Sequence, residues 1–459
     1  GEDLTANDKI AGGPQVTFDA RGNALAVWIR AEFDNDGNAN PTNPIVQAAV
    51  RPAGGTWQTS VNLSVAAQGR GGGAVRVAVN AQGNAVAVWT RSNGTNFIVQ
   101  GAVRPAGRAW QAPIDLSIAG QDAGAPHVGI DPQGDAVAVW ARFNGTNDVV
   151  QAAVRLHDVT PVDLSAVGQD ASDPQVAVDS QGDAVAVWTR SNGTNFIVQA
   201  AARPAGGAWQ APINLSATGQ NASTPQVGID AQGDAVAVWT HFSGTNDIVQ
   251  AAARSGGGAW QAPVNLSAVG QNAVAPQVGI DAQGDAVVVW TRSNGINDIV
   301  QAAARSAGGA WQAPVSLSAA GQNASDPQVA VNAQGNAVAV WTRSNGSNDI
   351  VQAAARSAAG AWQAPVSLSG TGQNASAPQV GVDGQGDAVA VWTRSNGSND
   401  IVQAAARSAA GAWQTPVSLS GTGQNAGASQ VAVNAQGNAV AVWRRFNRSN
   451  WIVQAAAAA

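Results

Sequence analysis

The sequence predicts an all-β protein, a single β-propeller of nine four-stranded antiparallel blades that spans residues 1–459. A segment Ala-Val-Ala-Val-Trp, or a close relative, recurs nine times, and the spacing is 51 residues except for one interval of 61 and one of 48. Each repeat contains four short runs typical of strands, and no 3.6-residue apolar period indicates a helix. Four antiparallel strands in about 51 residues is the period of a propeller blade, whereas β-solenoid coils are shorter and parallel. The segment ends at Trp28, Trp89, Trp140, Trp188, Trp239, Trp290, Trp341, Trp392 and Trp443.

The fourth repeat illustrates the elements in order. Residues 174–179 contain alternating Val and end at a Gln-Gly-Asp turn, and residues 184–190 alternate Ala with Val before Trp-Thr-Arg. An Asn-Gly turn at 192–193 leads to a third run at 197–200, and a Pro-Ala-Gly-Gly turn at 204–207 leads to the last run at 212–216. Turns this short join antiparallel neighbours. Val on one side and Ala or Trp on the other predict blades that are buried on both faces.

The two ends of the chain predict how the ring closes. Residues 2–5 align with the outermost strand of a repeat, and residues 452–455 align with a third strand that no fourth strand follows. We therefore expect the N-terminal segment to supply the missing outer strand of the ninth blade, which removes two free sheet edges.

Composition excludes several kinds of chemistry. The chain has no Cys and no Tyr, which excludes disulfides, thiolate nucleophiles and a tyrosine nucleophile of the sialidase type. A single lysine, Lys9, makes a Schiff-base mechanism implausible. The net charge of −6 without a basic block argues against a nucleic-acid partner. The apolar runs are too short for a transmembrane segment.

The hairpin at residues 407–420, Arg-Ser-Ala-Ala-Gly-Ala-Trp-Gln-Thr-Pro-Val-Ser-Leu-Ser, resembles the Asp-box hairpin of sialidase-like propellers. The Asp of that motif is absent from every copy. The whole repeat also resembles those of bacterial propeller lectins, which share the Gly-x-Trp and Pro-Val-x-Leu ending. The resemblance implies a propeller with a degenerate Asp box and a lectin-like role, but no catalytic residues can be carried over.

A cation follows the inner Trp by two residues in every repeat. It could form a ring of groups that bind carboxylates or sugar hydroxyls. The alternative is a cross-strand ion pair with the Asp six residues on, as for Arg142 with Asp148 or Arg343 with Asp349. The candidates for ligand binding are Arg91, Arg142, Arg190, His241 and Arg445. A second Arg, before the outer Trp of each hairpin, is interpreted as structural and could stack on that Trp.

The loop between the second and third runs lies on the same face as the links between blades, and it is where the copies differ most. One aromatic side chain stands there in repeats two to five, two stand in the ninth, and none in the sixth to eighth. These residues predict a partial aromatic arc suited to stacking on sugars, and local packing is the alternative. They are Phe97, Phe143, Phe196, Phe242, Phe446 and Trp451.

One segment suggests a cofactor. The insertion after Trp28 places Asp34, Asp36 and Asn38 at alternating positions around Gly37, as a Ca²⁺ loop would, although no bidentate Glu follows. An ordinary Asx-rich turn is the alternative. The repeated Asp-Ala-Gln-Gly-Asp turns, as at 281–285, read as Asn in other copies, so turn chemistry explains them better than a metal does.

These observations predict an extracellular, non-catalytic module that binds a carbohydrate or another surface ligand through the loops of one face. The alternatives are a structural scaffold of near-identical blades, which could self-associate, and a glycan-cleaving enzyme that uses Asp pairs. Near-identical repeats weigh against an enzyme, because an active site needs unlike residues in one place. We expect a secreted or cell-surface protein, of bacterial type, with a glycan or cell-surface partner and no cofactor other than Ca²⁺.

Overall fold

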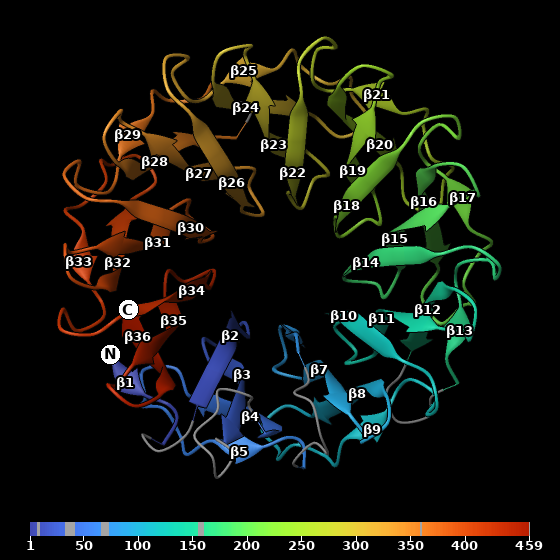
Figure 1. Cartoon of the computed structure of the whole chain (residues 1–459), viewed down its shortest axis with the longest axis horizontal. Helices are drawn as coiled ribbons and strands as arrows, with labels where there is room; N and C mark the ends of the chain where they lie inside the picture. The colour runs from blue at the N-terminus through green and yellow to red at the C-terminus, as the bar shows by residue number, and fades with distance from the viewer. Residues whose placement is uncertain (7–9, 33–41, 66–72, 155–159, 359, 459) are drawn as a thin grey trace.

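The computed structural model describes residues 1–6, 10–32, 42–65, 73–154, 160–358 and 360–458. These residues form nine four-stranded antiparallel sheets arranged around a ring (Figure 1). The prediction of an all-β propeller with nine blades is therefore confirmed. None of the described residues lies in a helix, so this part of the chain contains no helix that could cross a membrane.

The blades are numbered 1 to 9 in the order of their innermost strands, which surround the centre of the ring (Figure 1). The innermost strands are β2 (Ile10–Phe18), β6 (Val75–Val79), β10 (Ala123–Ile130), β14 (Ala171–Val178), β18 (Ala222–Ile229), β22 (Ala273–Ile280), β26 (Ala324–Val331), β30 (Ala375–Val382) and β34 (Ala426–Val433). The second strands are β3 (Ala24–Glu32), β7 (Ala85–Ser92), β11 (Ala136–Phe143), β15 (Ala184–Ser191), β19 (Ala235–Phe242), β23 (Ala286–Ser293), β27 (Ala337–Ser344), β31 (Ala388–Ser395) and β35 (Ala439–Phe446).

The third and fourth strands complete each blade toward the rim. The third strands are β4 (Thr42–Arg51), β8 (Phe97–Arg104), β12 (Asp148–Val154), β16 (Phe196–Arg203), β20 (Asp247–Arg254), β24 (Asp298–Arg305), β28 (Asp349–Arg356), β32 (Asp400–Arg407) and β36 (Trp451–Ala458). The short outer strands are β5 (Val61–Asn62), β9 (Ile114–Asp115), β13 (Val162–Asp163), β17 (Ile213–Asn214), β21 (Val264–Asn265), β25 (Val315–Ser316), β29 (Val366–Ser367), β33 (Val417–Ser418) and, in blade 9, β1 (Glu2–Asp3).

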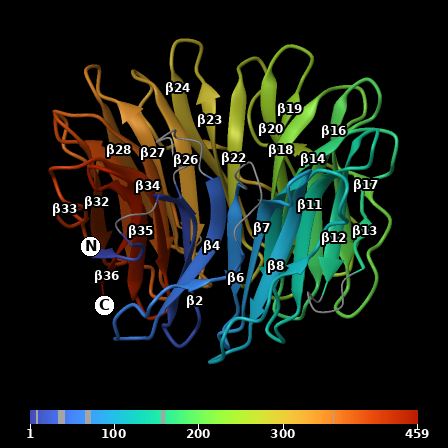
Figure 2. The same ribbon diagram turned by 60° about the horizontal axis from the view of Figure 1, so that its bottom comes forward.

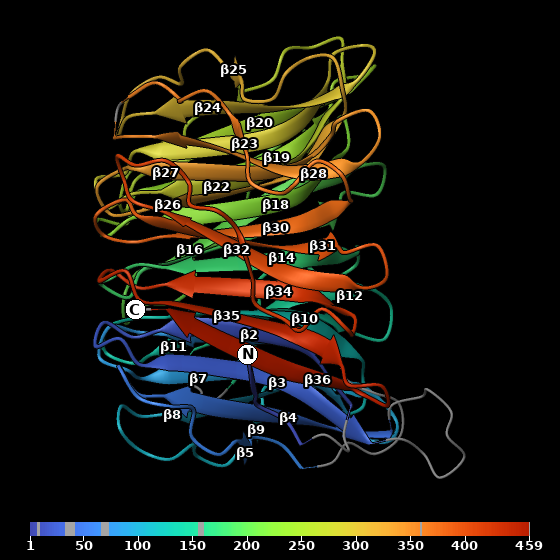
Figure 3. The same ribbon diagram turned by 90° about the vertical axis from the view of Figure 1, so that its left-hand side faces the viewer.

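The N-terminal strand closes the ring as predicted. Strand β1 pairs antiparallel with β36, with Glu2 opposite Ala455 and Asp3 opposite Gln454. The side chain of Gln454 donates from Nε2 to Oδ1 of Asp3 at 2.6 Å. The two ends of the chain consequently lie beside each other in both views of the ring (Figures 1 and 3).

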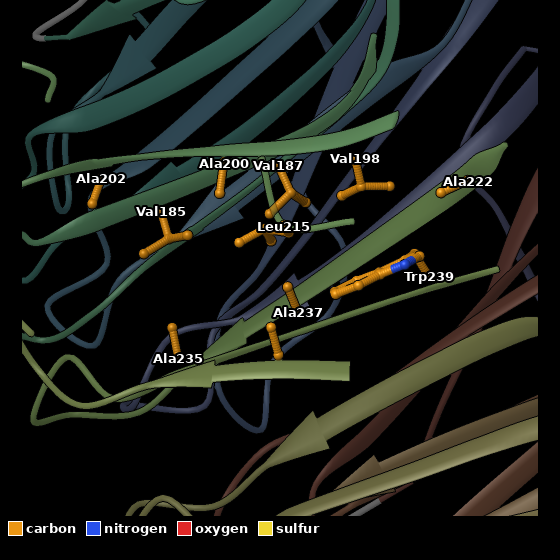
Figure 4. Close-up of a cluster of buried hydrophobic side chains, with 11 residues drawn as sticks. Val185, Val187, Val198, Ala200, Ala202, Leu215, Ala222, Ala235, Ala237 and Trp239 are labelled. Atoms are coloured by element: carbon orange, nitrogen blue, oxygen red, sulfur yellow. The ribbon is translucent and has the colours of Figure 1, made fainter. Parts of the chain in front are cut away.

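Each interface between blades joins two unlike surfaces. Val185 and Val187 of blade 4 pack against Ala237 and the fully buried Trp239 of blade 5 (Figure 4). The same layering recurs around the ring. Burial of such side chains stabilises the fold by roughly 1.5–3 kcal/mol each, and the small Ala side chains leave room for the indole. The alternation of Val with Ala therefore encodes the contact between neighbouring blades, as the sequence indicated.

The innermost strands other than β6 have a bulge near their start, where the backbone adopts a left-handed conformation, and in blade 2 the left-handed residue directly precedes β6. The register of β14 shifts between Ser172 and Gln175, and Asp173 between them has a φ of 52°. Left-handed residues other than Gly are strained, and blade 1 has Gly13 at this position. The other equivalents are Ala74, Ala125, Thr224, Ala275, Asp326, Ala377 and Ala428, with φ between 46° and 55°. The sequence pattern did not predict these bulges.

The connections gather on two faces, because the strands run from one face of the ring to the other (Figures 2 and 3). We call the loop face the one that carries the loops between second and third strands and the links between blades, such as residues 192–195 and 217–221. The turn face is the opposite one, which carries turns such as residues 179–183 and 204–212.

Two turn-face features match the interpretations made from sequence. The carboxylate of Asp281 accepts the backbone N–H groups of Gln283 and Asp285 at 2.9 and 2.8 Å, which confirms an Asx-type turn. The guanidinium of Arg305 lies 5.8 Å from the ring centre of Trp311, and that of Arg407 lies 6.0 Å from Trp413. These contacts confirm the cation–π role predicted for the second Arg in blades 6 and 8.

Candidate functional site

In the links between blades 2 and 9, one residue at each interface ties the loop face together. Between blades 4 and 5, Oδ1 of Asn221 accepts the backbone N–H of Phe196 at 2.9 Å. Its backbone oxygen accepts the N–H of Phe242 in the next blade at 2.7 Å. Asp122 makes the equivalent two bonds between blades 2 and 3. This residue therefore fixes the hairpin end of one blade against that of its neighbour.

The predicted aromatic residues occupy two positions that oppose each other across the hairpin of the loop face. The first residue of the third strand is Phe97, Phe196 or Trp451, and the last residue of the second strand is Phe143, Phe242 or Phe446. In blade 4 the register places Phe196 opposite Ser191, on the same side of the sheet as Val187, which faces the next blade. The rings of Phe143, Phe196 and Phe242 are 40%, 49% and 37% exposed. Their role in binding stays a prediction.

The ninth blade uses its two aromatic residues for local packing. The rings of Phe446 and Trp451 lie 5.7 Å apart at an angle of 53°. The guanidinium of Arg444 lies 4.6 Å from the centre of the Trp451 ring. The Trp451 side chain is half-buried, so it offers less of its surface to a ligand than the exposed phenylalanines of blades 3 to 5.

A pocket of about 570 Å³ opens on the loop face between blades 2 and 3. Phe97 of blade 2 lines it, as do Asp148 and the bulge residue Ala125 of blade 3. Asp122 and Thr90 contribute polar side chains. The lining of the pocket thus includes an aromatic residue, two aspartates and a threonine.

Three carboxylates are concentrated around this pocket. Oδ1 of Asp122 accepts the N–H of Phe97 at 2.7 Å, and Oδ1 of Asp170 accepts the N–H of Asp148 at 3.1 Å. Burial raises the pKa of Asp148, and the negative charges of Asp170 and Asp122 raise it further. The links of later blades carry Asn instead, at Asn221, Asn272, Asn323, Asn374 and Asn425. These carboxylates were not among the residues predicted from the sequence, although the sequence shows the change from Asn to Asp in two of the links.

The predicted arginines lie on the other side of the sheet from the aromatic residues. Arg142 is opposite Val149, so its side chain faces the preceding blade, and it donates a short hydrogen bond to Oε1 of Gln121 in the link. Arg445 bonds Gln424 in the same way and also lies 3.7 Å from Oδ1 of Asp3. Arg91 and Arg190 share this register position. By this register, the arginine of one blade faces the aromatic position of the blade before it, except in blade 5, which carries His241 instead.

The alternative of an ion pair with the Asp six residues on is wrong for Arg142 and Arg343. Asp148 is opposite Phe143 and Asp349 is opposite Ser344. Each aspartate therefore pairs with the residue that directly follows the arginine, and not with the arginine itself. The pleat therefore places arginine and aspartate on opposite sides of the blade. Among the residues that the structure describes, neither arginine forms an ion pair with its predicted partner.

His241 replaces the arginine in blade 5 and is buried, with 5% of its surface exposed. Burial lowers its pKa, and the charge of Asp247 opposes that shift. Its Nδ1 is buried without a hydrogen-bond partner. A buried neutral imidazole is a poorer contact for a large ligand than an exposed arginine.

The predicted Ca²⁺ ligands Asp34, Asp36 and Asn38 lie outside the described residues, so their prediction stays untested. Within the described ranges, no group of three or more His, Asp or Glu side chains is arranged to hold a metal ion.

No known protein family matches the chain, and no curated protein matches it. Solved structures do match, at low identity. A structure described as a eukaryotic initiation factor is 9% identical with a TM-score of 0.50, covering 91% of this chain and 90% of its own. An ulvan lyase of polysaccharide lyase family 25 is 10% identical with a TM-score of 0.44, covering 74% and 92%. The GH93 α-L-arabinofuranosidase of Fusarium graminearum is 12% identical with a TM-score of 0.33, covering 62% and 92%.

These matches correct one prediction. The expectation that the chain is not an enzyme is contradicted, because the propellers similar to it include a polysaccharide lyase and an arabinofuranosidase. Near-identical repeats do not exclude an active site here, since the copies diverge on the loop face and bring unlike residues together there. At such low identity the likeness concerns the fold and assigns no activity. It likewise leaves the lectin and Asp-box resemblances unconfirmed beyond the propeller architecture.

Proposed function

We propose that this protein binds carbohydrate on its loop face, with the pocket between blades 2 and 3 as the principal site. The observation that supports this proposal is a pocket of about 570 Å³ whose lining includes Phe97, Asp122 and Asp148. An aromatic ring stacks on the C–H face of a sugar, while carboxylates accept hydrogen bonds from its hydroxyls. The pocket is large enough for a monosaccharide or a disaccharide.

The phenylalanines of the next blades support a multivalent mode of binding. Phe143, Phe196 and Phe242 stand at equivalent interfaces and keep exposed rings. Several weak sites on one rigid ring raise the overall affinity for a polymer or a decorated surface, because the second contact becomes intramolecular. We therefore propose a polymeric or surface-borne glycan as the ligand, and an extracellular or cell-surface location for the protein.

A glycan array followed by calorimetry tests the proposal. We expect Phe97→Ala to weaken binding of the best glycan at least about fivefold, which corresponds to about 1 kcal/mol of lost stacking. Ile296→Ala is the matched control, since Ile296 is an apolar residue on the loop face of blade 6 with 90% of its surface exposed. Absence of glycan binding together with ordered self-association would favour the scaffold alternative, and equal effects of the two variants would reject the site.

One observation favours a second function for the same pocket, glycan cleavage. Burial and two neighbouring carboxylates raise the pKa of Asp148, and a carboxyl with a raised pKa can act as a general acid toward a glycosidic oxygen, with Asp122 as the second carboxyl of the pair. If so, bound glycan is turned over, and Asp148→Asn abolishes turnover while leaving binding in place. Asp298→Asn, at the equivalent position of blade 6, is the control that should retain turnover. No turnover on a glycan panel would reject the catalytic role and leave the binding proposal intact.

A further inference from the structure

Three equivalent grooves run along the turn face near the rim, each between two adjacent blades. They lie between blades 1 and 2, 3 and 4, and 6 and 7, with cavity volumes of about 580, 630 and 390 Å³. In each groove, the third and fourth strands of one blade form one wall. The hairpin of the next blade forms the other wall and contributes its outer Trp: Trp110, Trp209 or Trp362.

The groove between blades 1 and 2 differs from the other two in charge. Three arginines line it, Arg21, Arg104 and Arg108, beside a single carboxylate, Asp19. Arg104 is the arginine that every such hairpin carries, but Arg21 and Arg108 are specific to this interface. The equivalents of Arg21 are Gln133 and Gln283, and those of Arg108 are Gly207 and Gly360.

The groove between blades 1 and 2 also has less negative charge around it than the other two grooves. Asn23 stands where the other two interfaces carry Asp135 and Asp285. The carboxylate of Asp19 is engaged within its own turn, because it accepts the N–H groups of Arg21 and Asn23 at 3.0 and 2.8 Å and the Nδ2 of Asn23 at 2.7 Å. Among the described residues, the guanidiniums of Arg21 and Arg108 form no ion pair. The groove therefore presents excess positive charge in a protein whose net charge is −6.

We propose that the groove between blades 1 and 2 binds an acidic saccharide, a sugar chain that carries carboxylate groups. The exposed Arg21 and Arg108 would hold the carboxylates, since the guanidinium fork matches a carboxylate in a bidentate contact. The half-buried Trp110 and the side chains of Gln58 and Asn62 would contact the neutral parts of the sugar. This site lies on the opposite face from the Phe97 pocket and does not depend on it.

The repeats themselves supply the test variants. The double variant Arg21→Gln and Arg108→Gly installs the residues of the two equivalent grooves, so it preserves a turn and a hairpin that already fold in this chain. With an oligogalacturonate as the probe, we expect this variant to lose binding by about tenfold or more. We expect binding to weaken as salt is raised. Phe97→Ala should leave oligogalacturonate binding unchanged, which separates this site from the loop-face pocket.

Introducing the two arginines into an equivalent groove tests the proposal by a gain of binding and not only by its loss. Gln133→Arg together with Gly207→Arg gives the groove between blades 3 and 4 the same two arginines, and we expect a second oligogalacturonate site to appear. A neutral xylo-oligosaccharide and inorganic phosphate serve as comparison probes. No binding of oligogalacturonate to the native chain, undiminished binding by the double variant, or equal binding of either comparison probe would overturn the proposal.

Discussion

The buried indole of Trp188 donates a hydrogen bond of 3.2 Å from Nε1 to Oε1 of Gln199, and Gln199 in turn donates from Nε2 to Asn214 at 2.8 Å. This series of hydrogen bonds links the second, third and fourth strands of blade 4. In blades 6 to 8 the fourth strand carries Ser in place of Asn or Asp, and the bond from Gln lengthens to 3.3–3.4 Å. In these same blades Nε1 of Trp290, Trp341 and Trp392 is buried without a partner. The residue on the outer strand therefore decides whether the indole Nε1 of the inner Trp has a hydrogen-bond partner.

Exchanging Asn and Ser at this position of the fourth strand should lower stability in one blade and raise it in another. We expect Asn214→Ser to lower the free energy of unfolding by about 1 kcal/mol, and Ser367→Asn to raise it by a similar amount, because a satisfied buried donor is worth about that much. Urea denaturation followed by Trp fluorescence measures both. Unchanged denaturation midpoints for both variants would show that this series of hydrogen bonds contributes nothing to stability.

Replacing the first Asp of a turn-face turn by Asn should stabilise the protein at neutral pH. Asn80 and Asn332 donate from Nδ2 at 2.8 Å to the backbone oxygens of Asp131 and Asp383 in the next blade. Asp179 occupies the same position, and its Oδ2 is buried without a partner. We expect Asp179→Asn to gain about 1 kcal/mol by restoring this hydrogen bond. Asn332→Asp, the reverse change, should lose stability.

The gain from Asp179→Asn should depend on pH. Burial raises the pKa of Asp179 in the folded chain, so folding favours its protonated form. The native carboxyl therefore costs stability at neutral pH, and this cost disappears as the pH falls through the raised pKa. The difference between native and variant denaturation midpoints should shrink in acid. A difference that is constant from neutral to acidic pH would contradict the assignment.

His127 should give the opposite pH dependence. Burial and the charge of Arg76 lower the pKa of His127 to about 4. Because the folded pKa lies below the unfolded one, its contribution to stability is full above the unfolded pKa of about 6.5 and is lost as the pH falls toward about 4. We expect the imidazole NMR signals of His127 to titrate near pH 4, and Arg76→Gln to raise that midpoint. His127→Gln, which installs the residue of seven other blades, should remove this part of the acid sensitivity.

The strained bulges offer a test of backbone energetics. Ala377 is exposed and has a φ of 51°, and blade 1 carries Gly13 at the same position. Because a left-handed residue with a Cβ costs roughly 1–2 kcal/mol, we expect Ala377→Gly to leave the unfolding midpoint unchanged or higher. Ser376→Gly, at the neighbouring position with ordinary φ, should lower it. Destabilisation by both changes to the same extent would contradict the assigned strain.

Much of the candidate site could be predicted from the sequence, because its elements are set by local pattern. The position of Phe196 at the hairpin end, and its equivalents in other blades, follow from strand alternation and turn residues. The pairing of Arg142 with Asp148 was predicted wrongly, because a spacing of six residues across a hairpin was read without the register that the turn imposes. The convergence of Asp122 and Asp148 on one pocket was missed, because it joins a link to the next blade's hairpin.

Sequence alone predicted the number of blades, the strands within each, the closure of the ring by residues 2–5 and the two unlike faces of every blade. These features follow from periodicity, alternation and turn chemistry, which act over a few residues at a time. The fold of the whole ring was needed to show which residues of neighbouring blades line one pocket, such as Phe97 with Asp148 or Arg21 with Arg108. Such contacts join residues that the register and the packing of whole sheets bring together, and those depend on long-range geometry that no single repeat encodes.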